Sequence, residues 1–240
     1  MKQEKWTDVE ELCGNDFAMS SAFPALMRKV FVWMALALAI TGLTAFGVAT
    51  SPTLVTAIFS SKLMFWGLII AEFALVFAIS GAINKLSLST ATLLFILYSV
   101  VNGATLSVIF FAFSTAVIAK TFFITAGTFG VMALVGYTTK TDLTSMGKLL
   151  FMALLGIIIA SVVNMFVHSS GFDLIISYVG VLIFVGLTAY DTQKIKQMCL
   201  MAPDAGETAQ KLALLGALEL YLDFINLFLY LLRIFGNNKD

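Results

Sequence analysis

The chain has 240 residues, of which 60% are hydrophobic and 12% are charged, and its 14 basic and 14 acidic side chains cancel to a net charge of zero. A soluble domain is about 45–50% apolar and about 25% charged. The charged residues of this chain are too few to form the water-facing surface of a soluble globule of this size. The composition excludes an ordinary soluble domain and favours a membrane protein. There is no basic run, so no nucleic-acid partner is expected.

The first 29 residues are polar and carry charges of both signs. A secretory signal would show a short basic stretch and then an apolar run near the start, and this segment does not. We therefore expect residues 1–29 to form an uncleaved cytoplasmic arm, which is a candidate contact for a protein partner. Cys13 and Cys199 lie far apart without CxxC spacing, so neither a disulfide framework nor a cysteine metal site is expected.

Seven apolar segments follow this arm, each long enough to cross a bilayer core of about 30 Å as a helix. Their continuous apolar character favours helices over the alternating segments of about 10 residues that build membrane barrels. The predicted fold class is an all-α integral membrane protein, with one domain at 30–236 and a short tail at 237–240. The expected spans are 30–49, 63–83, 91–113, 117–137, 149–167, 174–197 and 211–235.

The orientation of the chain follows from its Lys and Arg residues. With seven spans, ten of these residues fall on the side of the N-terminus and four on the other side. Because basic residues are enriched in cytoplasmic loops, we expect a cytoplasmic N-terminus and a C-terminus outside.

Four acidic residues fall inside or at the ends of the apolar segments, namely Glu72, Asp191, Glu219 and Asp223. A charged carboxylate at the centre of a membrane costs about 2.5–3.5 kcal/mol on insertion scales. Such residues are retained where a partner or a function offsets that cost. They are the candidate functional residues of this chain.

The last span carries a polar stripe on one helix face, because its polar side chains are spaced by 4, 3, 4 and 3 residues. The sixth span carries a second stripe that ends at Asp191. If the two faces pack together, Asp191 approaches Asp223, and two close carboxyl groups tend to share one proton. The stripe of the last span consists of Glu219, Asp223, Asn226, Tyr230 and Arg233.

This acidic cluster has two interpretations. It could respond to pH or bind a cation, with Asp191 and Asp223 as metal ligands, because calcium prefers several oxygen ligands. It could also be an inert hydrogen-bonded carboxyl pair that fixes the register of two helices. Glu72 lies in the middle of its span and should point into the bundle, where functional and structural roles are both open.

Two segments carry a resemblance to a known family. Residues 186–196 (GLTAYDTQKIK) and 218–228 (LELYLDFINLF) resemble motifs of the Bax inhibitor-1 family, also called the transmembrane Bax inhibitor motif family. The resemblance includes residues 136–140 (GYTTK), extends over nearly all seven spans and fades in the N-terminal arm. Its overall character is that of a branch found in the bacterial inner membrane, which is therefore the expected location.

The resemblance implies a seven-helix fold whose last helix is surrounded by the others. It also implies a pH-sensing aspartate pair, which Asp191 and Asp223 match. Some members of the family are described as pH-sensitive calcium leak channels. Others restrain cell death or stress responses, or associate with a membrane-anchored ATP-dependent protease.

Two departures from the family pattern stand out. Some relatives have an arginine latch just after the second helix, and Lys85 is the possible substitute here. Lysine cannot form the bidentate clamp that arginine makes with a carboxylate, so such a latch would be looser. Glu219 adds a third carboxylate where many relatives have a small or hydroxyl residue.

The first hypothesis for function is a cation leak channel or transporter, for calcium, gated by the Asp191–Asp223 pair. Glu72, Glu219 and Asn226 would line the pore or bind the ion. No cofactor is expected apart from calcium as the transported ion. The direction of gating is open, because a shared proton could clamp the helices together or could release a cationic latch.

Two alternatives compete with transport. The chain could regulate a membrane-anchored protease or a stress response without moving ions. It could also be an intramembrane aspartyl protease, since two aspartates that share a proton can activate water. The GxGD signature of such proteases is missing around Asp223, so we do not expect an enzyme.

Overall fold

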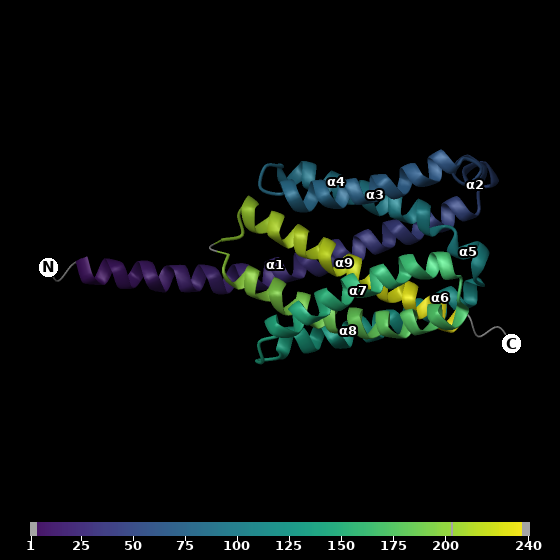
Figure 1. The fold of residues 1–240 in the computed structure, drawn as a ribbon. Coiled ribbons are helices and arrows are strands. Elements are labelled where there is room, and N and C mark those ends of the chain that lie inside the picture. The colour runs from purple at the N-terminus through teal and green to yellow at the C-terminus, as the bar shows by residue number, and fades with distance from the viewer. Residues whose placement is uncertain (1–3, 203, 237–240) are drawn as a thin grey trace.

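The computed structural model describes the backbone of residues 4–202 and 204–236, and the side chains from residue 22 onward within those ranges. These residues form nine helices (Figure 1). The helices are α1 (Glu4–Ala49), α2 (Pro52–Phe59), α3 (Lys62–Ala82), α4 (Leu88–Leu106), α5 (Ile109–Ala112), α6 (Thr115–Thr138), α7 (Thr144–Val167), α8 (Ser170–Leu200) and α9 (Glu207–Gly236).

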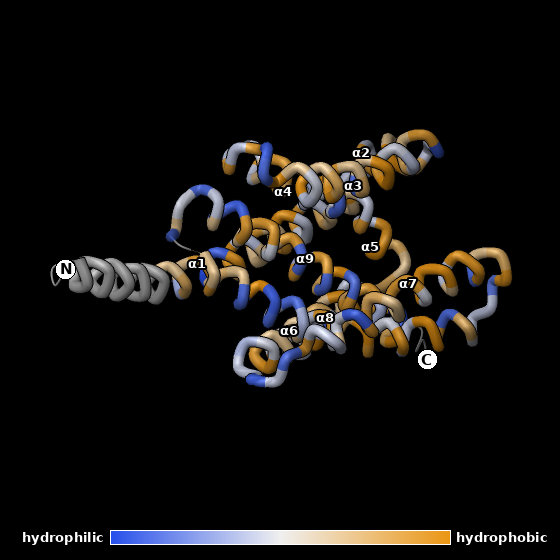
Figure 2. Tube along the Cα trace, turned by 60° about the vertical axis from the view of Figure 1, so that its left-hand side comes forward, coloured by the Kyte–Doolittle hydropathy of each residue, from blue (hydrophilic) through white to orange (hydrophobic). Residues whose placement is uncertain are grey.

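Seven segments of the described chain are helical, long enough and apolar enough to cross a membrane. The all-α fold class and the number of spans are therefore confirmed. The third span combines α4 and α5 and runs from Leu88 to Ala112. Figure 2 shows orange, apolar residues along most of each helix, and blue, hydrophilic residues at the turns and at some positions on the helices inside the bundle.

The first span is longer than expected. Helix α1 runs without interruption from Glu4 through residue 30 to Ala49, so it projects beyond the bundle (Figure 1). Leu26 and Met27 are buried against the rest of the bundle, so the packed part of this helix begins before residue 30. The predicted tail at 237–240 lies outside the described residues.

Two further details escaped the prediction. The loop after the first span contains the short helix α2, which begins at a proline, the residue best suited to the first helical turn. The third span is interrupted at Ser107, whose hydroxyl donates a hydrogen bond to the carbonyl oxygen of Ala104 at 2.7 Å. This local bond competes with the regular helical pattern, and the chain restarts as α5.

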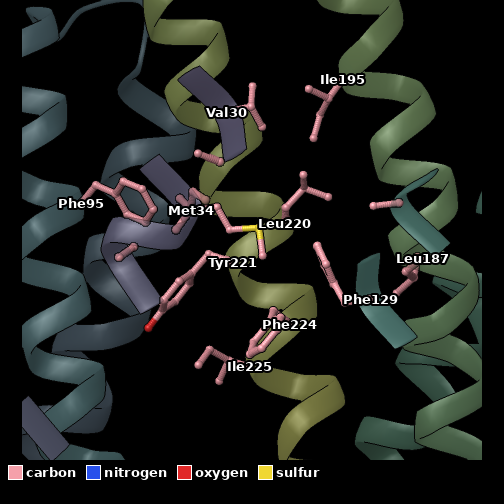
Figure 3. Packing of buried hydrophobic residues seen from close by; sticks show 14 of the residues in the cluster. Val30, Met34, Phe95, Phe129, Leu187, Ile195, Leu220, Tyr221, Phe224 and Ile225 are labelled. Carbon is pink, nitrogen blue, oxygen red and sulfur yellow. The ribbon is translucent and has the colours of Figure 1, made fainter. Parts of the chain in front are cut away.

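Helix α9 lies at the centre of the bundle, packed against α1, α4, α6 and α8. Figure 3 shows its side chains pointing to opposite sides, with Tyr221 directed toward α1 and α4 and Phe224 among the core residues. Leu220, Tyr221 and Leu227 have no exposed surface. A helix that is buried on all sides must place its polar residues against polar partners.

The bundle has two ends, which serve as reference points below. The N-terminal end is the one from which α1 projects, and the C-terminal end is the one at which α9 ends (Figure 1). Their assignment to the cytoplasm and the outside remains the prediction made from the basic residues.

Candidate functional site

The structure brings Asp191 of α8 and Asp223 of α9 together. Their carboxyl groups lie close enough to interact with each other. Asp223 is 5% exposed, and its Oδ2 atom is buried without a hydrogen-bond partner. A contact between two carboxyl oxygens is attractive only if one of them carries a proton. The geometry therefore fits a pair that holds one shared proton.

The two polar stripes pack against each other from the aspartate pair to the C-terminal end of the bundle. Beyond the aspartates, Gly180 of α8 lies directly against the ring of Tyr230 on α9. At the C-terminal end, Arg233 forms an ion pair with Asp173, with 3.6 Å between Nη1 and Oδ1. The approach of Asp191 to Asp223 was therefore correctly predicted from the periodicity of the polar residues in the two helices.

A lysine from α8 completes the acidic cluster. The Lys194 ammonium donates hydrogen bonds to both carboxylate oxygens of Glu219, at 2.9 and 3.1 Å. Both side chains are partly exposed, at 38% for Lys194 and 27% for Glu219. We define the acidic cluster as Asp191, Lys194, Glu219 and Asp223. Sequence reasoning missed Lys194, although its position three residues after Asp191 places both side chains on one helix face.

The segment of α8 around Asp191 is held firmly by its neighbours. Gln193 accepts a hydrogen bond from the backbone N–H of Leu143 and donates one to the carbonyl of Thr141, both at 2.8 Å. These bonds tie α8 to the loop between α6 and α7. Asp191 therefore projects from a fixed position toward α9.

Glu72 does not join the acidic cluster. Its carboxyl group lies beside Asn102 and Thr105 of α4, and its Oε1 atom is buried without a hydrogen-bond partner. It belongs to a second polar region, where the Tyr221 hydroxyl donates to Asn102 Oδ1 at 2.9 Å and lies 2.7 Å from Thr41 Oγ1. The two polar regions lie on different sides of α9.

The hydrogen bonds of Tyr221 should contribute measurably to stability. Tyr221→Phe removes the hydroxyl and leaves Asn102 and Thr41 buried with one partner fewer. We expect a loss of about 1–2 kcal/mol in the free energy of unfolding, because interhelical hydrogen bonds in membrane proteins are weaker than the desolvation of their groups suggests. Reversible unfolding in detergent with increasing SDS measures this loss. Tyr178→Phe, at a tyrosine that is 54% exposed, is the control and should change stability by less than about 0.5 kcal/mol. Equal losses in Tyr221→Phe and Tyr178→Phe would show that the hydrogen bonds of the Tyr221 hydroxyl do not contribute to stability.

The remaining predicted site residues lie apart from the acidic cluster. The Asn226 side chain donates to the carbonyl of Leu222 at 2.8 Å, within its own helix. Lys85 is exposed just beyond the end of α3, and no ion pair within the described residues includes it. Within residues 22–202 and 204–236, no group of three or more His, Cys, Asp or Glu side chains is arranged to hold a metal ion.

This fold and site define a class: helical membrane proteins of seven spans whose central last helix meets its neighbour through an aspartate pair. Comparison with known proteins identifies the family. Residues 24–240 match the model of the family described as inhibitor of apoptosis-promoting Bax1. The chain belongs to this family, the Bax inhibitor-1 family, as its sequence motifs indicated.

Relatives from distant bacteria share most of the chain. An uncharacterized protein of Borreliella burgdorferi is 51% identical over 214 residues, which is 89% of this chain and 92% of the relative. The inner membrane protein YbhL of Escherichia coli is 50% identical over 215 residues, with the same coverage of 89% and 92%. An uncharacterized membrane protein of Streptococcus pyogenes is 40% identical over 185 residues, covering 77% of this chain and 80% of the relative. The chain is thus a membrane protein with an inner-membrane homologue.

Proposed function

We propose that this protein is a pH-sensitive cation leak channel of the bacterial inner membrane, with calcium as the transported ion. The observation that carries the proposal is the close approach of the Asp191 and Asp223 carboxyl groups, with Asp223 Oδ2 buried and without a hydrogen-bond partner. A shared proton joins α8 to α9 and closes the route between them. The proposal involves no covalent chemistry and no enzyme activity.

The sign of gating follows from the charges around the pair. Lys194 is already bound to both oxygens of Glu219, so the acidic cluster has no second cation to neutralise two ionised aspartates. Loss of the shared proton leaves two facing carboxylates in a medium of low dielectric constant, where they repel each other strongly. We therefore expect α8 and α9 to separate, and flux to increase, as the pH rises.

Cation binding during transport would be transient. When the pair is ionised, Asp191 and Asp223 offer carboxylate oxygens of the kind that calcium prefers. Glu72, on another side of α9, would act at a separate point of the route, since its Oε1 atom has no protein partner. Lys85 would contribute no latch in the closed state, because its side chain is exposed.

The test is calcium flux from liposomes that contain the purified protein and an encapsulated calcium dye, measured across a series of pH values. Flux through the wild-type protein should rise by up to about tenfold per pH unit around the transition, because one proton is lost. Asp223→Asn should keep flux low at every pH, since an amide always carries the hydrogen that holds Asp191.

Asp142→Asn, in the exposed loop between α6 and α7, is the matched control and should retain the wild-type profile. A wild-type profile in Asp223→Asn would remove the pair from the mechanism. Flux that increases on acidification would contradict the proton clamp and favour the alternative in which protonation releases the helices.

A second candidate function is binding of a partner protein, such as a membrane-anchored ATP-dependent protease, without transport. The observation that favours it is the part of α1 at residues 4–21, which extends beyond the first span as a helix. The same liposome assay separates the two functions. A folded protein that passes no calcium at any pH would leave partner binding as the better explanation.

A further inference from the structure

An apolar groove runs along one side of the bundle between α1 and α6. It encloses about 330 Å³, and its floor is formed by α9 through Phe224, Ile225 and Phe228. The walls include Gly42 of α1 and Ala119 of α6, and Phe110 of α5 contributes at the C-terminal end. Among all the lining residues, Thr41 and Thr115 alone carry a polar side chain.

This groove lies within the membrane and is continuous with the lipid-facing surface. Its lining residues come from the first, third, fourth and last spans. Phe46 and Phe123 stand at its rim and are 53% and 73% exposed. The surface beside the groove is therefore in contact with lipid, and the groove opens sideways into the bilayer.

Water is a poor occupant of this groove. A bound water needs two to four polar partners, and the Thr41 hydroxyl is already engaged by Tyr221 and by the carbonyl of Ser99 at 3.0 Å. An empty groove would deprive its aromatic lining of dispersion contacts. A transmembrane helix is about 10 Å wide with its side chains, too thick for a space of 330 Å³.

We propose that the groove is a binding site for one hydrocarbon chain of a membrane lipid. The hydrocarbon chain of the lipid comes from an environment that is already apolar. Its binding is therefore driven by packing against the phenylalanine rings rather than by the hydrophobic effect. The occupant enters between α1 and α6 and lies against Phe224 and Phe228. Because Phe224 follows Asp223 in α9, the bound chain braces the helix that carries half of the aspartate pair. The site stands independently of the proposed transport.

The test is photolabelling in liposomes of phosphatidylethanolamine and phosphatidylglycerol that contain a small fraction of phosphatidylglycerol with a diazirine near the end of one acyl chain. Helix α9 lines the groove through Phe224, Ile225 and Phe228, which are at most 8% exposed, so label within residues 224–228 reports an acyl chain in the groove. After irradiation, mass spectrometry of peptides should find label on this segment of α9, in the region of Phe224 and Phe228.

Gly42→Trp fills the groove from α1, since no atom lies within 4 Å of a Cβ built at this position. Label within residues 224–228 should fall at least fivefold. Gly47→Trp is the matched control, because Gly47 is exposed on the same helix, is equally open and does not line the groove. Ala119→Trp fills the groove from α6 and provides a second variant in case Gly42→Trp does not fold.

The proposal is overturned if label on α9 is absent in the wild-type protein. It is also overturned if label on α9 persists in both groove-filling variants, or falls equally in Gly47→Trp. Label spread evenly over the exposed apolar faces would indicate bulk lipid and no binding site.

Discussion

Gly136→Ala, which adds one methyl group to α6, is expected to destabilise this bundle strongly. A Cβ at position 136 of α6 would collide with the carbonyl oxygen of Ala189 on α8. The obstacle is backbone, so no side-chain rotation relieves the clash, and the two helices must move apart. We expect destabilisation at or above the upper end of the about 1–3 kcal/mol typical of overpacking.

The measurement is the free energy of unfolding in detergent, together with the yield of folded protein. Gly127→Ala, on the same helix, is the control: nothing lies within 4 Å of a Cβ there, and its effect should be within about 0.5 kcal/mol. Comparable stability of the two variants would mean that α6 and α8 are less tightly packed than the structure indicates. Because Ala189 lies two residues from Asp191, surviving Gly136→Ala protein should also show altered pH dependence.

The sequence predicted the spans and the α8–α9 contact for the same physical reason. The hydrocarbon core of a bilayer requires long apolar helices, and the few polar residues of those helices are stable only where they face each other. The spacing of Glu219, Asp223, Tyr230 and Arg233 therefore identified the face of α9 that meets α8. The first span was predicted to begin at residue 30 because residues 1–29 are polar and carry charges of both signs, whereas α1 runs through this boundary as one helix.

The second polar region could not be predicted in the same way. Glu72 is isolated on an apolar helix, so periodicity shows that it points inward but not which helix it meets. Its neighbourhood depends on Tyr221, which lies between two leucines and does not belong to the polar stripe of the last span. The Tyr221–Asn102–Thr41 network joins residues more than 100 positions apart, and no local pattern reports such a contact. The pairing of Lys194 with Glu219 could not be predicted from the i, i+3 spacing of Asp191 and Lys194 alone. It also requires the register between α8 and α9.

Substitutions of Lys194 and of Glu219 that remove the charge should shift the pH dependence of flux in opposite directions. The charged groups that surround the aspartate pair are this lysine and this glutamate. Lys194→Met leaves Glu219 as an extra negative charge, which makes ionisation of the pair more costly, so the rise in flux should move to higher pH by about one unit or more. Glu219→Gln leaves the ammonium without its partner and should move the rise to lower pH.

The double variant decides whether this electrostatic explanation is correct. Lys194→Met with Glu219→Gln removes both charges and restores the neutral balance around Asp191 and Asp223, so its midpoint should return close to the wild-type value. If the shifts arose from disturbed packing, the double variant would instead show the largest disturbance. Lys194→Arg preserves the charge and should keep the wild-type midpoint. Shifts of the same sign in both single variants would mean that the charge of this ion pair does not set the proton affinity of the aspartates.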